Sequence, residues 1–394
     1  MTWSWLTIDP AAQAHDIWSG MTRIALKGVI LFVLANLVFA LLDPMPTISR
    51  ITVHNGLVAG RPRLPYGDNP SASFNLSLGS LEAMFATHTL HGTPKAADEY
   101  RVLVIGDSSV WGVLLQPEET LAGLLNQTQA VLPNGKRLRA YNLGYPVQSL
   151  AKDLLIMDYA KRYTPDVIVW LVTAESFAPD VQMSTQIVRE NPSAVRDLIG
   201  RYALRLDPND ARFVIPDFFG KTIIGRRRQL ADWLRLQFYG LTWSATQFDQ
   251  QYPRAYEPRM EDFPDDMPQA WHGFTETAGN LDADALAFDV LRAGVQLAKE
   301  RGIALLLINE PMFISSGENS DKRYNAFYPR WAYDIYRDAL SMMAQRQSIN
   351  YHDMWDAISA DQFTDSAVHL TPAGSQQFAE MILPLIEQIA QPVP

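Results

Sequence analysis

The sequence has 394 residues, with 33 basic and 43 acidic side chains and a formal net charge of −10. A nucleic-acid-binding protein normally carries a basic face, so this balance argues against a nucleic-acid partner. The chain has no cysteine, which excludes disulfides, thiolate metal sites and a cysteine nucleophile. With 47% hydrophobic residues, it is long enough for two domains or for one enlarged domain with a packed core.

One long apolar tract, Ile24 to Leu42, lies near the N-terminus. As a helix it would extend about 28 Å, close to the hydrocarbon thickness of a bilayer, about 30 Å. We therefore predict a single-pass membrane anchor preceded by a cytoplasmic or interfacial segment, residues 1–23. The tract begins late and no clear cleavage site follows, which argues against a cleaved signal peptide. Arg23 and Lys27 lie at its start and Asp43 follows it, which favours an extracytoplasmic body.

Residues 43–100 are rich in Pro, Gly, Ser and Asn, which predicts a stalk and a lead-in to the globular part. Residues 101–394 then alternate between apolar strand patterns and helical patterns. This alternation is typical of a parallel sheet covered on both faces. The expected strands are Val102–Ile105, Leu138–Leu143, Val167–Val172, Ile303–Ile308 and Ile349–Asp353. The expected helices are Thr120–Val131, Ser149–Tyr163, Ala283–Arg301, Arg330–Arg346 and Pro372–Ile389.

The alternation stops over residues 176–280, a stretch too long to be a loop in a compact domain. We predict a helical cap insertion beside the site, with a helix over Thr222–Leu241. The run Arg226 to Arg228, with Trp233 and Phe238 after it, fits either an amphipathic helix that touches lipid headgroups or a partner, or a solvated basic turn.

The first expected strand ends in Gly106-Asp107-Ser108. Open α/β sheets bind ligands at the carboxyl ends of their strands. The free N–H groups and the positive dipole end of a helix starting there would stabilise an oxyanion. We interpret Ser108 as a nucleophile. Ser109 would take this role only if the register were shifted by one residue.

A second polar motif precedes the last expected helix, where Thr371 is a good N-cap and Pro372 a good first helical residue. His369 therefore lies in a loop. A neutral imidazole there could accept the proton of Ser108, and an adjacent carboxylate would hold its tautomer. Asp365 is the nearest acid in the sequence.

Together, Gly106-Asp107-Ser108 and the Asp…His-Leu-Thr-Pro-x-Gly ending from Asp365 resemble the SGNH, or GDSL, esterase and acyltransferase superfamily. The resemblance covers roughly residues 101–389. It implies a flavodoxin-like three-layer α/β/α sandwich, with about five parallel strands in this chain. It also implies Ser108 as nucleophile, His369 as base and an Asp shortly before this His. The implied oxyanion hole uses the serine N–H, a glycine N–H after the second strand and an Asn side chain after the third.

Three positions depart from the family pattern. The family's Asp usually stands three residues before the His, where this chain has Ser366, whereas Asp365 stands four before. The glycine position falls on Val147, with Gly144 close by, and a Val N–H can replace a Gly N–H. The Asn position falls on Ala174.

The Ala at this last position removes a side-chain donor. Losing one oxyanion donor costs about 3 kcal/mol. Either Thr173, Gln148 or Ser176 supplies a substitute, or the enzyme reacts slowly with water, which suits an acyltransferase.

Asn309-Glu310-Pro311 follows the fourth expected strand and also resembles the acid/base motif of barrel glycosidases. That alternative needs a second carboxylate and about eight βα units, whereas we expect about five strands. Glu310 could still line the same cleft. The candidate substrate-binding residues are Asp107, Gln148, Glu175, Asn309 and Glu310.

The sequence thus predicts a membrane-anchored, extracytoplasmic serine esterase or O-acyltransferase that acts on acyl esters. An envelope glycan as acceptor, and a membrane acyltransferase as partner, are implied only by resemblance to anchored family members. Neither a metal nor an organic cofactor is implied. The alternatives are the glycosidase and a catalytically inactive SGNH-fold subunit that binds or scaffolds a membrane complex.

Overall fold

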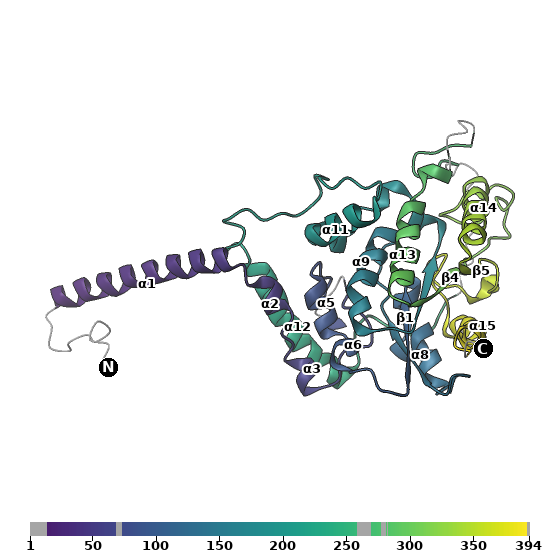
Figure 1. Cartoon of the computed structure of the whole chain (residues 1–394). Coiled ribbons are helices and arrows are strands. Elements are labelled where there is room, and N and C mark those ends of the chain that lie inside the picture. Colours follow the sequence, from purple (N-terminus) through teal and green to yellow (C-terminus); the bar gives the residue numbers. More distant parts are fainter. Residues whose placement is uncertain (1–13, 68–72, 258–268, 277–280, 282, 392–394) are drawn as a thin grey trace.

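The computed structural model describes residues 14–67, 73–257, 269–276, 281 and 283–391. A five-stranded parallel sheet forms the centre of the body (Figure 1), with the strand order β2-β1-β3-β4-β5. This confirms the expected α/β fold, and the order is that of flavodoxin-like sheets. The strands are β1 (Glu99–Ile105), β2 (Arg137–Asn142), β3 (Val167–Val172), β4 (Ala304–Asn309) and β5 (Asn350–Asp353).

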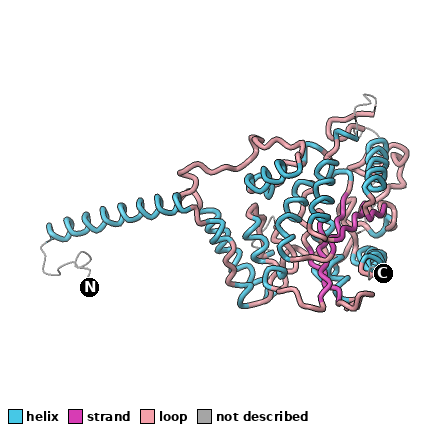
Figure 2. Tube along the Cα trace, viewed as in Figure 1, coloured by secondary structure: helices cyan, strands magenta, loops and turns pink. Residues whose placement is uncertain are grey.

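The central strands β1 and β3 are buried along their whole length. Alternate side chains of a strand point to opposite faces, and here each face has its own core. Leu103 and Ile105 pack with α9 (Leu150–Ala160) and α13 (Phe288–Glu300). Val102 and Val104 pack with α8 (Leu121–Gln127) and α15 (Pro372–Ile389). The result is a three-layer sandwich, with helices on both sides of the strands in Figure 2.

The lead-in of residues 43–100 is folded into the body rather than extended as a stalk. Leu64, Met84 and Phe85 are fully buried in the core. The composition of the segment is misleading because short helices separated by Pro and Gly still bury their apolar side chains. The helices are α2 (Met45–Ser49), α3 (His54–Leu57), α5 (Leu81–Thr87) and α6 (Thr89–Gly92).

The described part of the predicted insertion, residues 176–257 and 269–276, is spread over more than one side of the body. Two of its helices, α10 (Gln186–Glu190) and α11 (Pro192–Tyr202), pack on α9. The longest, α12 (Arg227–Thr246), packs instead on α3 and α5. Helix α14 (Arg330–Gln347), which follows the insertion in sequence, packs beside β5.

The N-terminal helix α1 (Ala14–Leu42) projects away from the body (Figure 1). Its residues Trp18–Leu42 are long and apolar enough to cross a membrane, and an 18-residue window within them has a mean hydropathy of 2.4. Only its last turns touch the body, where Asn36 and Ala40 are buried. Residues 1–13 of the predicted N-terminal segment lie outside the described residues.

Candidate active site

Ser108, His369 and Asp365 lie in one chain of hydrogen-bonding contacts. Ser108 is the first residue of the short helix α7 (Ser108–Trp111), which follows β1. Nε2 of His369 lies 2.8 Å from Oγ of Ser108, although the two residues are 261 positions apart. Nδ1 of His369 lies 2.8 Å from Oδ1 of Asp365. The structure therefore brings together the three residues that the sequence predicted for a triad.

The loop that carries Asp365 and His369 is fixed at both ends. The N–H of Thr364 donates to the carbonyl of His369 at 2.8 Å, which closes a tight turn around Asp365. Thr371 caps α15 by accepting the N–H of Gly374 at 3.0 Å. The closed turn explains why an Asp four residues before the His, rather than three, can reach the imidazole.

Asp365 is half-exposed, with 54% of its side chain accessible. The hydrogen bond from His369 holds the pKa of the Asp365 carboxyl below its usual value, against the opposing effect of partial burial. A carboxylate that stays ionised at neutral pH can keep the imidazole in one orientation, with Nε2 directed at Ser108.

Two of the predicted oxyanion N–H groups, those of Ser108 and Val147, have no hydrogen-bond acceptor among the described residues. The N–H of Ser108 begins α7 and has no intrahelical acceptor. Val147, in the loop after β2, has a φ of +76°, which a β-branched residue rarely adopts and a glycine adopts readily. Its N–H makes no hydrogen bond to any residue that the structure describes.

The other two predicted oxyanion groups are already engaged. The N–H of Gly144 donates to Oδ1 of Asn142 at 3.0 Å. A Cβ on Gly144 would lie 2.3 Å from the backbone nitrogen of Trp111, so this glycine permits close packing on α7. Oγ1 of Thr173 lies 3.0 Å from the hydroxyl of Tyr328, and its side chain is buried. Neither group is therefore free to bind an oxyanion in this geometry.

Ala174 is buried at the position where the family has Asn. Its neighbour Glu175 instead contacts His272 of the insertion, with Oε1 2.8 Å from Nε2, and Nδ1 of His272 lies 2.8 Å from Asp180. Burial disfavours the charged imidazole, but the hydrogen bonds that His272 donates to Glu175 and Asp180 outweigh this effect and raise the pKa of His272 to about 9. No sequence motif identifies His272 as a residue of this region. Only its contacts with Glu175 and Asp180 do so.

Asp107 and Glu310 face the protein interior rather than a substrate. Asp107 caps α7 by accepting the N–H of Ser109 at 2.8 Å. The hydroxyl of Ser109 donates to Glu310, which is only 2% exposed. Burial, and then the negative charge of Asp107, raise the pKa of Glu310 well above its usual value. Glu310 lines a small pocket beside Ser109, Pro311 and Val368, and its carboxyl group is almost fully enclosed there.

Asn309 is also an interior residue, with both ends of its amide paired. Its Nδ2 donates to Asp353 at 2.7 Å, and its Oδ1 accepts from Tyr336 at 3.0 Å. Of the five candidate substrate-binding residues, only Gln148 and Glu175 are partly exposed.

A buried arginine holds the loop that follows α7. Arg63 donates through Nη1 to the carbonyls of Gly112 and Leu115, both at 2.9 Å, and through Nε to Asp249 at 2.8 Å. Gln250 donates to the same two carbonyls at 2.8 Å. Arg63 of the lead-in and Gln250 of the insertion thus both hold the loop that follows α7, which we call the nucleophile loop. The sequence analysis did not predict that either segment would contact this loop.

Lys152 connects the two backbone segments that carry the free N–H groups. Its Nζ donates to the carbonyl of Gly106 at 2.8 Å and to that of Tyr145 at 2.7 Å. It also lies 2.9 Å from the carboxylate of Asp153, and both side chains are buried. This contact fixes the end of β1 relative to the loop that contains Val147.

No family model matches the sequence, and no curated protein matches it. Solved structures do match. A GDSL-like lipase from Bacteroides thetaiotaomicron VPI-5482 has a TM-score of 0.37 and 11% identity over 75% of this chain and 92% of that chain. The psychrotrophic esterase EstA from Pseudoalteromonas sp. has a TM-score of 0.38 and 9% identity over 73% and 97%. A carbohydrate acetylesterase family member from Sinorhizobium meliloti has a TM-score of 0.35 and 11% identity over 73% and 98%.

Proposed function

We propose that this chain is a membrane-anchored serine ester hydrolase or O-acyltransferase. The observation that carries the proposal is the position of His369, whose two ring nitrogens lie 2.8 Å from Ser108 and 2.8 Å from Asp365. A serine, an imidazole and a carboxylate in this order are the arrangement that activates a hydroxyl for acyl transfer.

In the proposed reaction, Oγ of Ser108 attacks the acyl carbon of an ester while His369 takes its proton. The N–H groups of Ser108 and Val147 stabilise the oxyanion of the tetrahedral intermediate. The intermediate collapses, the ester C–O bond breaks, and His369 gives its proton to the departing alcohol. Water or an acceptor hydroxyl then loses a proton to His369 and attacks the acyl-enzyme. The bond between the acyl carbon and Oγ breaks, and His369 returns the proton to Oγ of Ser108.

The choice between water and a hydroxyl acceptor depends on the oxyanion hole. Ala174 contributes no side-chain donor, and the loss of one donor costs about 3 kcal/mol. A weaker hole slows attack by water and leaves the acyl-enzyme time to meet a bound hydroxyl. This supports an O-acyltransferase, for which we propose an envelope glycan as acceptor and a membrane acyltransferase as partner.

The proposed location follows from α1. Residues Trp18–Leu42 have the length and hydropathy of a membrane span. Arg23 and Lys27 lie at the start of the apolar tract and Asp43 at its end, which supports a cytoplasmic N-terminus and an extracytoplasmic body.

An inactive scaffold subunit is the second candidate, favoured by Ala174 and by the exposure of Asp365. The glycosidase alternative is not retained, because it requires an eight-stranded barrel. The described sheet is open with five strands, and Glu310 is buried.

The proposal is tested by a p-nitrophenyl ester series of increasing acyl length, assayed on the full chain in detergent with and without a polysaccharide acceptor. We expect ester cleavage that depends on Ser108, with the acyl group recovered on the polysaccharide. Cleavage with recovery only as free acid would identify a hydrolase. Equal rates for the parent and Ser108→Ala on every ester would favour the scaffold.

A further inference from the structure

One stripe of exposed positions on α12 is apolar. Ala231, Leu234, Phe238, Leu241 and Ala245 recur every three or four residues and form this stripe, with Arg227 at its N-terminal end. Leu234 is 48% exposed and Phe238 60% exposed, while the opposite stripe is buried against the body. A helix on a water-facing surface normally presents polar side chains outward. We therefore expect the exposed apolar stripe of α12 to contact an apolar environment rather than water.

The neighbouring lead-in extends this apolar face. Ile51, Val53 and Leu57 are 51%, 49% and 70% exposed. Nε1 of Trp233 donates to the carbonyl of Ile51 at 2.9 Å, which joins this segment to α12. We call the combined surface the apolar platform, made up of Ile51, Val53, Leu57, Leu234, Phe238 and Leu241. A group of exposed apolar side chains on two packed segments is typical of an interaction site.

The platform adjoins the end of the candidate membrane span. The N–H of Ile224, three residues before α12, donates to Oδ1 of Asn36 in α1 at 3.2 Å. Asp43, just after α1, pairs with Lys221 at 3.1 Å and with Arg226 at 3.3 Å. Figure 1 shows that α12, α2 and α3 form the edge of the body from which α1 departs. The platform thus lies at the edge of the body from which the candidate membrane span departs (Figure 1).

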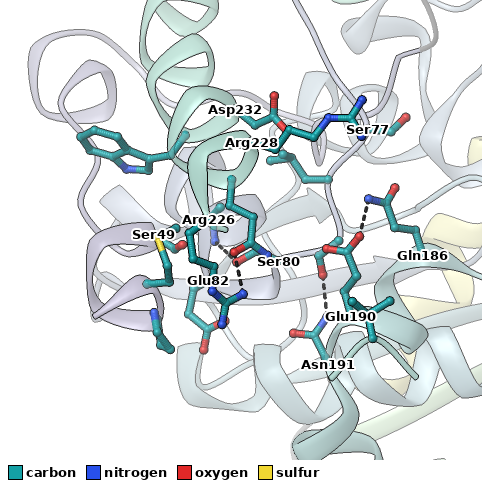
Figure 3. Close-up of a pocket in the computed structure, with 18 of the residues that line it drawn as sticks. Ser49, Ser77, Ser80, Glu82, Gln186, Glu190, Asn191, Arg226, Arg228 and Asp232 are labelled. Atoms are coloured by element: carbon teal, nitrogen blue, oxygen red, sulfur yellow. Dashed lines mark hydrogen bonds between the residues drawn. The ribbon is translucent and has the colours of Figure 1, made fainter. Parts of the chain in front are cut away.

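Polar and apolar groups are separated across this part of α12. Arg226, Arg228 and Asp232 face a pocket of about 510 Å³ between α12, α2, α5 and α10, together with Glu82 and Glu190 (Figure 3). Arg228 and Arg235 line this pocket and are also exposed at the edge of the apolar stripe, and Arg227 is exposed at the N-terminal end of the stripe. Basic side chains at the rim of an apolar helix face are typical of helices that lie in the headgroup layer of a membrane.

We propose that the apolar platform rests in the interfacial layer of the bilayer that α1 spans, with α12 lying along the membrane surface. This inference rests on the proposed anchoring of Trp18–Leu42. The molecules that cover the apolar platform are lipids. Their acyl chains contact Leu234 and Phe238, and anionic headgroups contact the flanking arginines. Because Asp249 and Gln250 follow α12 and hold the nucleophile loop, docking of α12 sets the height of Ser108 above the membrane.

The absence of cysteine allows spin labels at single positions in the full chain. The variants are Phe238→Cys and Leu234→Cys on the platform, Val33→Cys in α1, and Met342→Cys on α14. Met342 is an exposed apolar residue of α14, and Figure 1 shows α14 on the far side of the body from α1. Each labelled protein is placed in nanodiscs containing phosphatidylglycerol, and the accessibility of the label to oxygen and to a water-soluble nickel chelate is measured.

We expect platform labels to gain oxygen accessibility and lose nickel accessibility relative to Met342→Cys, and to lie between it and Val33→Cys. If Val33→Cys reports lipid while both platform labels match Met342→Cys, the platform proposal is overturned and the anchor stands. If Val33→Cys reports water, the anchor itself is refuted. Platform labels shielded from both reagents would overturn lipid as the occupant and indicate a protein partner or a second copy.

Discussion

Ser109 donates its hydroxyl to the buried carboxyl group of Glu310, whereas the adjacent Ser108 faces His369. The cap formed by Asp107 fixes this division, because it holds the N–H of Ser109 at the start of α7. The two neighbouring serines therefore have different surroundings. Ser109 supports α7 through its contact with the buried Glu310, whereas Ser108 contacts the imidazole of His369.

The first prediction concerns Glu310→Gln. Burial and Asp107 raise the pKa of Glu310 well above its usual 4.5. The proton bound by Glu310 therefore stabilises the fold fully at pH values below the pKa of the unfolded state. This stabilisation is lost as the pH rises through the pKa of the folded state. Gln keeps the polar contact without a charge. We expect the variant to be more stable than the parent at neutral pH, with a difference that shrinks towards pH 4.

Urea unfolding of both proteins between pH 4 and pH 8 measures this difference. A stability difference that does not change with pH would contradict it. Ester cleavage should survive in Glu310→Gln, contrary to the glycosidase alternative.

The second prediction concerns Val147→Gly. A non-glycine residue at positive φ costs roughly 1–3 kcal/mol, while glycine costs about 0.5–1 kcal/mol of backbone entropy. We expect the variant to be more stable by about 1 kcal/mol. Its ester cleavage should be little changed, because the backbone N–H remains. Val131→Gly, an exposed valine without a positive φ, is the matched control and should lose stability. A loss in both variants would argue against strain at Val147.

The third prediction concerns the buried pair of Arg63 and Asp249, which lie 1% and 2% exposed. Asp249→Ala leaves the guanidinium of Arg63 buried without its carboxylate. We expect a loss of about 3–5 kcal/mol in the free energy of unfolding. The double variant Arg63→Met, Asp249→Leu should recover part of it. Chemical denaturation checks both, and a loss below about 1 kcal/mol for Asp249→Ala would contradict the structural role of the pair.

The fourth prediction distinguishes Asp365 from Ser366, the residue at the family's usual position. Asp365→Asn removes the charge that holds the imidazole, so we expect kcat to fall by about 10²–10⁴-fold. The exposure of Asp365 favours the lower end, because water can replace part of the contact. Ser366→Ala is the matched control and should keep its kcat. The reverse result would show that Asp365 is not the partner of His369.

The centre of the sheet could be predicted from the sequence because β1, β3 and β4 contain continuous apolar runs. The expected Val167–Val172 and Pro372–Ile389 agree with the observed bounds of β3 and α15. Helix α12 was predicted from Thr222 but begins at Arg227. The preceding residues form turns around Gly220 and Gly225, which a helical pattern of apolar residues does not reveal.

The site was predictable only in part. Ser108, Asp365 and His369 stand in local motifs at element ends, and such motifs can be read from the sequence. Arg63 and Asp249 are 186 residues apart, and His272 meets Glu175 across 97. Nothing local marks these contacts, because they exist only once the lead-in and the insertion have folded around the sheet.

The central claim is that Ser108 is a nucleophile activated by His369. The most direct measurement is covalent labelling of the full chain by a fluorophosphonate, with the modified residue located by mass spectrometry. We predict labelling at Ser108 that persists in Ser109→Ala, is lost in Ser108→Ala and is strongly slowed in His369→Ala. Labelling of Ser109, or a failure of the folded parent protein to react at all, would contradict the account.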